Sequence, residues 1–155
     1  MIANNWNEAK VQVDAWKFAG LKVVFTNGCF DILHRGHVEY LADAKLLGSK
    51  LVLALNSDRS VLELKGARRP IQTQDDRAAI LDALESIDLV VVFDEDTPAK
   101  IIQMLLPDVL VKGSDYSTET IVGADTVIKN GGDVKVVPFR PGHSTSEMLE
   151  KIIKL

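Results

Sequence analysis

Two histidines that lie three residues apart, His34 and His37, have the clearest chemical potential in this sequence. An apolar run at 21–25 precedes them and a helical pattern at 38–47 follows, so they stand where a strand turns into a helix. Backbone N–H groups at a helix start lack partners within the helix, and the helix dipole favours an anion there. Two imidazoles add hydrogen-bond donors, and Gly36 between them lets the backbone approach a ligand closely. The turn therefore predicts a phosphate-binding site.

A histidine pair with this spacing has two other interpretations when it is considered by itself. The pair is more often a solvated part of a turn than a ligand site. A metal site would need more than the two ligands that this spacing supplies. The single cysteine, Cys29, adds little to such a site, and we expect it to be a small buried residue rather than a nucleophile.

Length, composition and charge limit the possible classes of protein. The chain has 155 residues, of which 46% are hydrophobic, and we expect one globular domain over 1–155. The net charge of −4 argues against a general nucleic-acid binder. No apolar run approaches the roughly 18 residues of a membrane span, and the first residues do not form a signal sequence. We therefore expect a cytoplasmic protein without a nucleic-acid or membrane partner.

The order of apolar runs predicts an α/β fold, a single Rossmann-like domain. Five short apolar runs alternate with helical patterns, which indicates a five-stranded, mostly parallel sheet with helices on both faces. These runs lie at 21–25, 51–56, 88–93, 108–112 and 133–137. Residues 1–20 are expected to form an N-terminal helix whose Trp6 and Trp16 pack on the core or on a second subunit. A helix that begins after Thr73 and carries Arg77 is expected to serve packing.

Polar side chains follow several of the predicted strands, at the edge where open α/β sheets bind ligands. They lie at 56–58, 112–115 and 140–146. A basic loop at 65–70 would usually be solvated surface, but beside the histidine turn we expect it to close over a triphosphate. Lys45 either reaches solvent, supports the helix after the histidines or reaches the site. Ser144 and Glu147 have the spacing of a capping box, at a helix start that also suits an anion.

The sequence lacks the motifs of several common phosphate-handling enzymes. It has neither a Gly-x-x-x-x-Gly-Lys-Ser/Thr loop nor a Gly-x-Gly-x-x-Gly fingerprint, and no nucleophile elbow centred on serine. A reaction that uses bound phosphates without a protein nucleophile remains, and nucleotidyl transfer is such a reaction.

The string Gly-Cys-Phe-Asp-Ile-Leu-His-Arg-Gly-His at 28–37 resembles the signature of the cytidylyltransferase-like nucleotidyltransferases. The resemblance extends from residue 23 to about residue 152. Leu-Lys-Gly-x-x-Arg-Pro at 64–70 and Val-Lys-Gly-Ser-Asp-Tyr at 111–116 resemble in particular the adenylyltransferases of bacterial ADP-heptose synthesis. His143 stands where relatives that act on glycerol phosphate carry isoleucine.

This resemblance implies a reaction and a set of site residues. ATP, with Mg²⁺, would transfer its adenylyl group to D-glycero-β-D-manno-heptose 1-phosphate, in a stand-alone homodimeric enzyme supplied by a separate kinase. The implied catalytic residues are His34, His37, Lys65 and Arg140. The implied nucleotide-binding residues are Asn27, Gly28, Cys29, Phe30, Asp31, Gly36, Lys112, Gly113, Asp115, Ser144, Thr145 and Ser146. The implied acceptor-binding residues are Asn56, Asp58 and Arg69.

Two alternatives stay open at this point. A cytidylyltransferase that acts on glycerol 3-phosphate or another small alcohol phosphate would share every phosphate-binding feature. A catalytically silent nucleotide-binding subunit is the second alternative, and the complete set of His34, His37, Lys65 and Arg140 argues against it.

Overall fold

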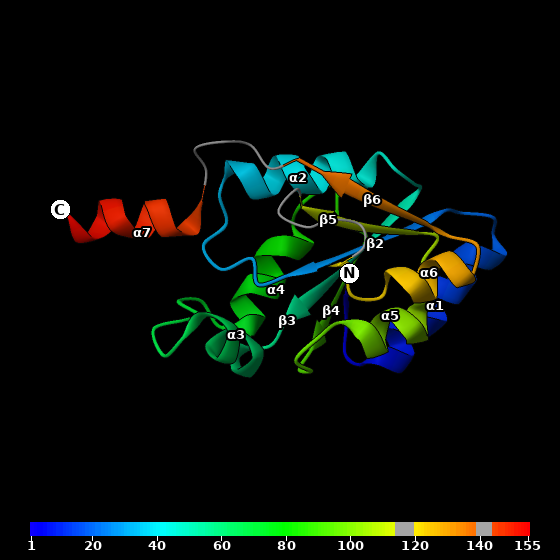
Figure 1. Cartoon of the computed structure of the whole chain (residues 1–155), viewed down its shortest axis with the longest axis horizontal. Coiled ribbons are helices and arrows are strands. Elements are labelled where there is room, and N and C mark those ends of the chain that lie inside the picture. Colours follow the sequence, from blue (N-terminus) through cyan, green and yellow to red (C-terminus); the bar gives the residue numbers. More distant parts are fainter. Residues whose placement is uncertain (114–119, 139–143) are drawn as a thin grey trace.

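The computed structural model describes residues 1–113, 120–138 and 144–155, and within them six strands form one parallel sheet (Figure 1). The order across the sheet is β1-β4-β3-β2-β5-β6. The strands are β1 (Ile2–Ala3), β2 (Val23–Gly28), β3 (Lys50–Asn56), β4 (Leu89–Phe93), β5 (Val109–Gly113) and β6 (Asp133–Val137). The helices are α1 (Trp6–Phe18), α2 (Arg35–Lys45), α3 (Asp58–Lys65), α4 (Gln74–Asp82), α5 (Ala99–Leu105), α6 (Ala124–Lys129) and α7 (Thr145–Ile153).

The α/β class and the parallel sheet are confirmed, but the predicted number of five strands is wrong. The additional strand, β1, has two residues and pairs with β4 through the registers Ile2↔Val90 and Ala3↔Val91. So short a segment has no apolar periodicity, and it is held by backbone hydrogen bonds to β4. The chain between β3 and the basic loop also forms a helix, α3, so Lys65 lies at a helix end and the loop begins at Gly66.

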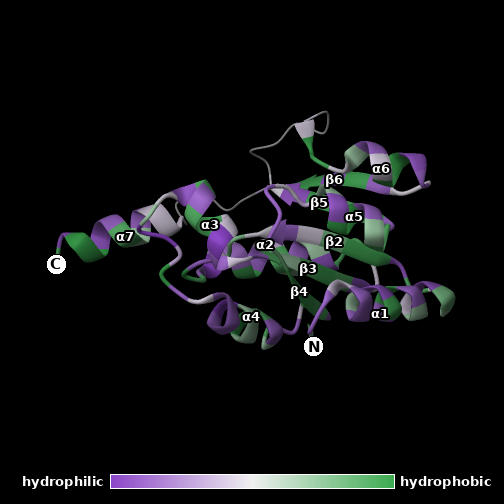
Figure 2. Cartoon of the chain, turned by 90° about the horizontal axis from the view of Figure 1, so that it is seen from below, coloured by the Kyte–Doolittle hydropathy of each residue, from purple (hydrophilic) through white to green (hydrophobic). Residues whose placement is uncertain are grey.

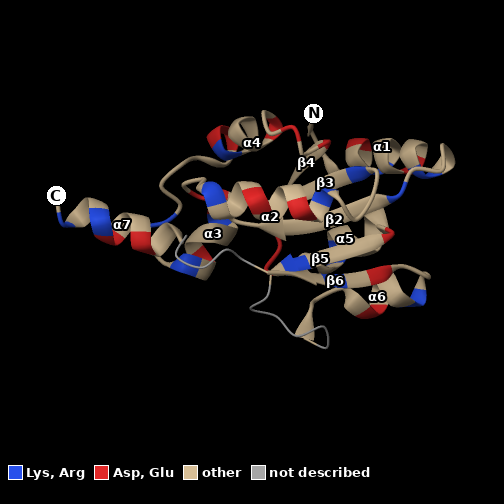
Figure 3. Cartoon of the chain, turned by 90° about the horizontal axis from the view of Figure 1, so that it is seen from above, with Lys and Arg blue, Asp and Glu red and all other residues tan. Residues whose placement is uncertain are grey.

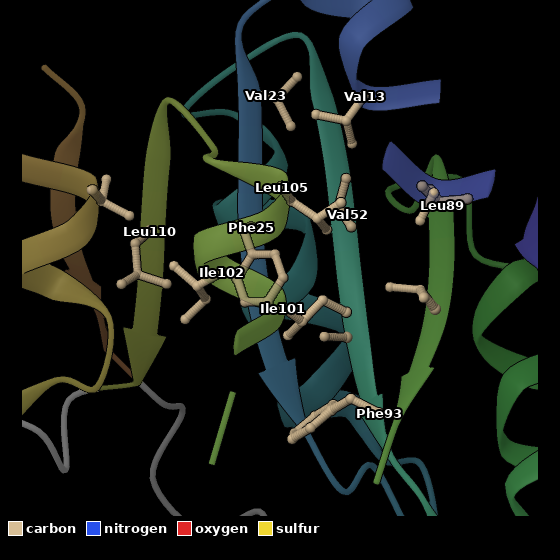
Figure 4. Packing of buried hydrophobic residues seen from close by; sticks show 14 of the residues in the cluster. Val13, Val23, Phe25, Val52, Leu89, Phe93, Ile101, Ile102, Leu105 and Leu110 are labelled. Carbon is tan, nitrogen blue, oxygen red and sulfur yellow. The ribbon is translucent and has the colours of Figure 1, made fainter. Parts of the chain in front are cut away.

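Helices cover both faces of the sheet, because consecutive strand residues point to opposite sides. On one face, α1, α5 and α6 pack over Phe25, Val52 and Leu110 (Figure 4). On the other face, α2 and α4 pack over Val24 and Leu53. Figure 2 shows hydrophobic residues along β3 and β4 and many hydrophilic residues on the surrounding helices, the pattern of a sheet that is buried on both faces.

The N-terminal helix packs on the sheet, which was one of its two expected positions. Trp6 donates from its indole nitrogen to the carbonyl oxygen of Val92 at 2.9 Å, and Trp16 packs against the core. By contrast, α7 extends away from the sheet and has no buried residue. Among the described residues, no helix has the length and apolar character required to cross a membrane.

The strand order creates a switch point between β2 and β5. From β2 the chain proceeds outward through β3 and β4 on one side, and later through β5 and β6 on the other. Helices after the two neighbouring strands therefore leave in opposite directions, and open α/β sheets bind ligands outside the carboxyl ends of the strands at such a point. We call this edge of the sheet, outside the ends of β2 and β5, the crevice. The histidine turn follows β2 and so lies at this crevice.

Candidate active site

The histidine turn joins the end of β2 to the start of α2. His34 is the residue that precedes the first turn of α2; its backbone is extended, with φ −138° and ψ 170°, and its side chain makes no capping hydrogen bond. The helix is anchored by its buried face, where the hydroxyl groups of Tyr40 and Thr26 are 2.7 Å apart. In the first turn, the amide of His37 donates to the backbone oxygen of His34 at 2.9 Å, whereas the amides of Arg35 and Gly36 have no acceptor within the helix and can bind an anion.

The two histidine rings stack on each other at this helix start. Their centroids are 3.8 Å apart and their planes differ by 18°. The rings of Phe30 and His37 make an edge-to-face contact, with a centroid distance of 5.2 Å and an angle of 61° between their planes. Burial, together with the charge of His34, lowers the pKa of His37 from 6.5 to about 4. His37 is therefore a neutral imidazole at neutral pH, which can donate one N–H to a phosphate oxygen.

Asp31 connects the histidine turn to the loop before α4. Its carboxylate accepts from Arg69 Nε at 2.5 Å, from the Ile71 amide at 2.8 Å and from the Gln72 amide at 3.0 Å. Burial acts to raise the pKa of Asp31, but these hydrogen bonds and the charge of Arg69 outweigh it and hold the pKa below its usual value. The carboxylate of Asp31 thus positions Arg69, and both side chains were expected to face ligands.

Lys112 and Asn27 meet across the switch point. Asn27 lies near the end of β2 and Lys112 near the end of β5, and the lysine ammonium donates to the side-chain oxygen of Asn27. Lys112 has an exposed fraction of only 9%. Burial lowers its pKa from 10.5 to about 8, although the neighbouring Cys29 acts in the other direction. A buried cation at the crevice favours an anionic ligand.

Arg77 organises the site in a way that the sequence did not reveal. Arg77 as a whole has an exposed fraction of 1%, and its guanidinium group donates to the carbonyl oxygens of Cys29, Asn56 and Gln72 at 2.6, 2.9 and 3.1 Å. It also donates to Asp58 at 2.8 Å. One side chain thereby joins the ends of β2 and β3 to the starts of α3 and α4. The helix around it was expected only to pack on the sheet.

Asn56 and Asp58, the other two residues expected to bind the acceptor substrate, interact with neighbouring groups of the protein. The side chain of Asn56 is buried and donates to Ser60 at 2.8 Å. Asp58 pairs with Arg77, and its side chain retains an exposed fraction of 43%. Asn56 is the last residue of β3 and Asp58 is the first residue of α3. Both therefore lie at the carboxyl edge of the sheet, as their place in the sequence indicated.

Cys29 lies among charged groups of the site. Burial raises the pKa of its thiol, although Lys65, Arg77 and Arg69 act to lower it. A protonated thiol is a poor nucleophile, so the geometry gives no support to cysteine chemistry. Lys65, which is exposed at the end of α3, is close enough for its charge to act on this thiol.

The start of α7 also belongs to this region. Ser144 accepts from the Glu147 amide at 3.1 Å, as the capping spacing predicted. Thr145 donates from its hydroxyl to the backbone oxygen of Asp31 at 3.0 Å, so the helix start is tied to the histidine turn. Ser146 is exposed in the first turn. Arg140 and Asp115 lie outside the described residues.

Lys45 stays away from the crevice and supports the far end of α2. It pairs with Asp88 and donates to the backbone oxygen of Ser49 at 2.7 Å. Basic and acidic residues both lie along α2 (Figure 3), and Arg35 pairs with Glu39 at 2.7 Å. The described residues contain no group of three His, Cys, Asp or Glu that could hold a metal ion.

A switch-point crevice with paired histidines at a helix start is the arrangement of a nucleotidyltransferase that works on bound phosphates. The chain belongs to the Cytidylyltransferase-like family, which matches residues 25–151. The bifunctional protein HldE of Marinomonas sp. (strain MWYL1) is 54% identical over 140 residues, which cover 90% of this chain and 30% of that protein. HldE of Magnetococcus marinus is 51% identical over 148 residues, with 96% and 30% covered. The chain thus spans about 30% of the length of these relatives.

Two solved structures resemble this chain. The lipopolysaccharide core biosynthesis protein of Thermoplasma volcanium is 31% identical, with a TM-score of 0.62 that covers 78% of this chain and 98% of that one. Pantoate-beta-alanine ligase of Francisella tularensis gives a TM-score of 0.63 over 100% of this chain and 78% of that one. At 14% identity, the second likeness shows the fold alone.

Proposed function

We propose that the chain transfers the adenylyl group of ATP to D-glycero-β-D-manno-heptose 1-phosphate and releases pyrophosphate. The stacked pair of His34 and His37 at the switch point is the observation that carries the proposal. The heptose acceptor is supported by the two motifs at 64–70 and 111–116 and by the similarity to a protein of lipopolysaccharide core biosynthesis. The bifunctional relatives are longer, so the proposal concerns only this one transfer.

In the proposed reaction, a phosphate oxygen of the sugar phosphate attacks the α-phosphorus of ATP. The bond from that phosphorus to the bridging oxygen of the β-phosphate breaks, and pyrophosphate leaves in line. No protein atom becomes covalently bound, so the protein contributes position and charge stabilisation. Neutral His37 donates a hydrogen bond to an oxygen of the α-phosphate, and His34, stacked on it, holds a neighbouring oxygen.

The cations of the site complete the proposed charge balance. Lys112 faces the phosphates from the end of β5, and Lys65 approaches from the end of α3. Arg140 is proposed to bind the outer phosphates beside the start of α7. Mg²⁺ neutralises the triphosphate when it is bound, and because the described residues offer no carboxylate cage, phosphates and water are its expected ligands.

The proposal extends to the surroundings of the reaction. A kinase activity would have to supply the sugar phosphate, and we propose that the reaction takes place in the cytoplasm, where ATP is available. We also propose a homodimer, which a monomer mass in light scattering at micromolar concentration would disprove.

The proposed reaction is tested by direct measurement of pyrophosphate release. ATP and CTP are each incubated with heptose 1-phosphate or glycerol 3-phosphate, with Mg²⁺ present. Turnover with ATP and heptose 1-phosphate alone supports the proposal. Turnover with CTP and glycerol 3-phosphate would keep the fold and the mechanism but replace the substrates, whereas no release in any mixture would indicate a silent nucleotide-binding subunit.

A further inference from the structure

Phe30 adopts a backbone conformation that non-glycine residues rarely adopt. Its φ is 45°, in the left-handed region, and Ile32 two residues later has a φ of 58°. Backbone strain of this kind persists only where the surrounding structure enforces it, and it gathers at functional sites. The histidine turn is such a place, because both residues lie between the end of β2 and the start of α2.

The ring of Phe30 occupies space that Gly28 leaves open. A Cβ atom at Gly28 would lie 2.8 Å from Cε2 of Phe30, closer than real Cβ contacts. The Phe30 side chain has an exposed fraction of 8% and packs in the hydrophobic cluster that includes Leu41 and Val111. The absence of a side chain at position 28 and the strained turn together place the ring between the hydrophobic core and the histidines.

His37 is held between two rings as a result. The edge-to-face contact with Phe30 limits the imidazole on one side, and the stack with His34 limits it on the other. The Nδ1 atom of His37 is buried and has no hydrogen-bond partner among the described residues. The orientation of this imidazole therefore depends on ring packing. In many other proteins, by contrast, a hydrogen bond made by the second ring nitrogen holds the histidine in place.

We propose that Phe30 is a positioning residue of the transfer site, whose ring fixes the plane of the His37 imidazole and shields it from water. The consequence for the reaction rests on the proposed function: a fixed, water-shielded imidazole aims its Nε2 atom at the α-phosphate without prior rearrangement. Phe30 was expected to contact the nucleotide, but its burial gives it this indirect role.

Several charged and polar groups lie near His37, and their effects on its titration have to be distinguished from the effect of the Phe30 ring. His34 is the titratable neighbour whose charge acts on His37, together with burial. On α2, Arg35 and Glu39 pair with each other at 2.7 Å, and the hydroxyl of Tyr40 meets Thr26 at 2.7 Å. A test must leave all of these groups in place and change only the Phe30 ring.

The test is a titration of the histidine side chains by long-range ¹H–¹⁵N NMR in the free protein. The chain has three histidines, so single substitutions at the other two assign His37. In the wild-type protein, His37 should stay neutral down to about pH 4. In Phe30→Leu, which keeps apolar bulk but removes the ring, its midpoint should rise by at least about one pH unit toward the ordinary value near 6.5. Phe93→Leu, at a buried ring in the opposite cluster, should leave the midpoint unchanged.

Gly28→Ala provides an independent variant that retains Phe30. Its methyl group displaces the ring, so the His37 midpoint should rise in the same direction. An unchanged midpoint in either folded variant overturns the proposal. Failure of both variants to fold would assign Phe30 to stability alone and would also overturn it.

Kinetics provide the second readout and separate this proposal from the function on which it rests. In Phe30→Leu, kcat for pyrophosphate release should fall by about 10- to 100-fold while KM for ATP changes little, since the ring affects orientation more than binding. The NMR result needs no substrate. A wrong choice of substrate would therefore leave the titration intact, whereas an unchanged titration would overturn the role of Phe30 whatever the substrate is.

Discussion

The Nη1 atom of Arg77 donates a hydrogen bond of 2.6 Å to the carbonyl oxygen of Cys29, the first residue after β2. The same atom donates to the carbonyl oxygen of Asn56 at the end of β3, at 2.9 Å. A single guanidinium group thus fixes the spacing between the ends of two neighbouring strands. These two strand ends lead to the histidine turn and to α3, so Arg77 fixes the position of the histidine turn relative to the start of α3.

Arg77→Met should therefore destabilise the fold strongly. The substitution removes the donor to three carbonyl oxygens and to Asp58, and each buried group left unsatisfied costs about 1–3 kcal/mol. We expect a loss of about 2–4 kcal/mol in the free energy of unfolding, measured by urea denaturation. Arg59→Met, which removes an exposed arginine that pairs with Asp94 and Glu63, is the matched control and should change stability little. Equal stability of the two variants would contradict this role.

Asp31→Asn should loosen the loop that precedes α4. The folded pKa of Asp31 lies below its unfolded value of 3.8, so its carboxylate stabilises the fold above pH 4 and loses this effect as the pH falls through the folded pKa. The stability difference between wild type and variant should therefore be constant from pH 5 to 8 and shrink at lower pH. Hydrogen exchange of the Ile71 and Gln72 amides should accelerate. Asp43→Asn, on the exposed side of α2, should leave these amides protected.

His37 should make the stability of the free protein depend on pH in a different range. Its pKa is about 4 in the folded chain and 6.5 in the unfolded chain, so unfolding takes up a proton between these values. Stability should fall as the pH decreases from 6.5 to 4, with a slope of at most about 1.4 kcal/mol per pH unit. Urea denaturation of wild type and His37→Gln across this range measures the effect. A slope that persists in the variant would assign the proton to another group.

The strands and the histidine turn could be predicted because their signals are local. Strands β2 to β5 each contain a continuous apolar run, and the turn combines a strand end, two histidines and a helix start within a few residues. β1 could not be predicted, because two residues gain their conformation only by pairing with β4, more than eighty residues away.

The internal supports of the site could not be predicted for a related reason. Arg77 and Asp31 bind mainly backbone groups, and a backbone carbonyl or amide carries no sequence signal at all. The partners also lie far apart in the chain, such as Cys29 and Arg77, which are 48 residues apart. The sequence therefore indicates which side chains have chemical potential, while tertiary packing decides which of them face a ligand and which hold the site together.

Lys112→Met should weaken ATP binding by about 10- to 100-fold, because a hydrogen bond to a charged partner contributes about 1.5–3 kcal/mol. The pKa of Lys112 is about 8 in the free protein, so its charge is lost as the pH rises through that value. Wild-type affinity should therefore fall between pH 7 and 9, and binding at the higher pH should take up a proton. Calorimetry in two buffers of different ionisation enthalpy measures both quantities. Lys129→Met, which changes an exposed lysine of α6, is the control and should bind ATP as the wild type does. A folded Lys112→Met variant with wild-type affinity for ATP would refute the placement of the phosphates beside β5.

His37→Ala should lower kcat for pyrophosphate release by roughly 100- to 1,000-fold, the usual effect of removing one preorganised donor from a developing charge. The stacked ring of His34 cannot replace it, because the two imidazoles occupy adjacent positions 3.8 Å apart. Circular dichroism spectra should accompany the steady-state assays, so that a loss of activity can be distinguished from a loss of folded structure. Arg35→Met removes a neighbouring cation that pairs with Glu39, and it should retain most of the activity. Near-normal turnover by a folded His37→Ala enzyme would show that the histidine turn binds its ligand without taking part in the transfer.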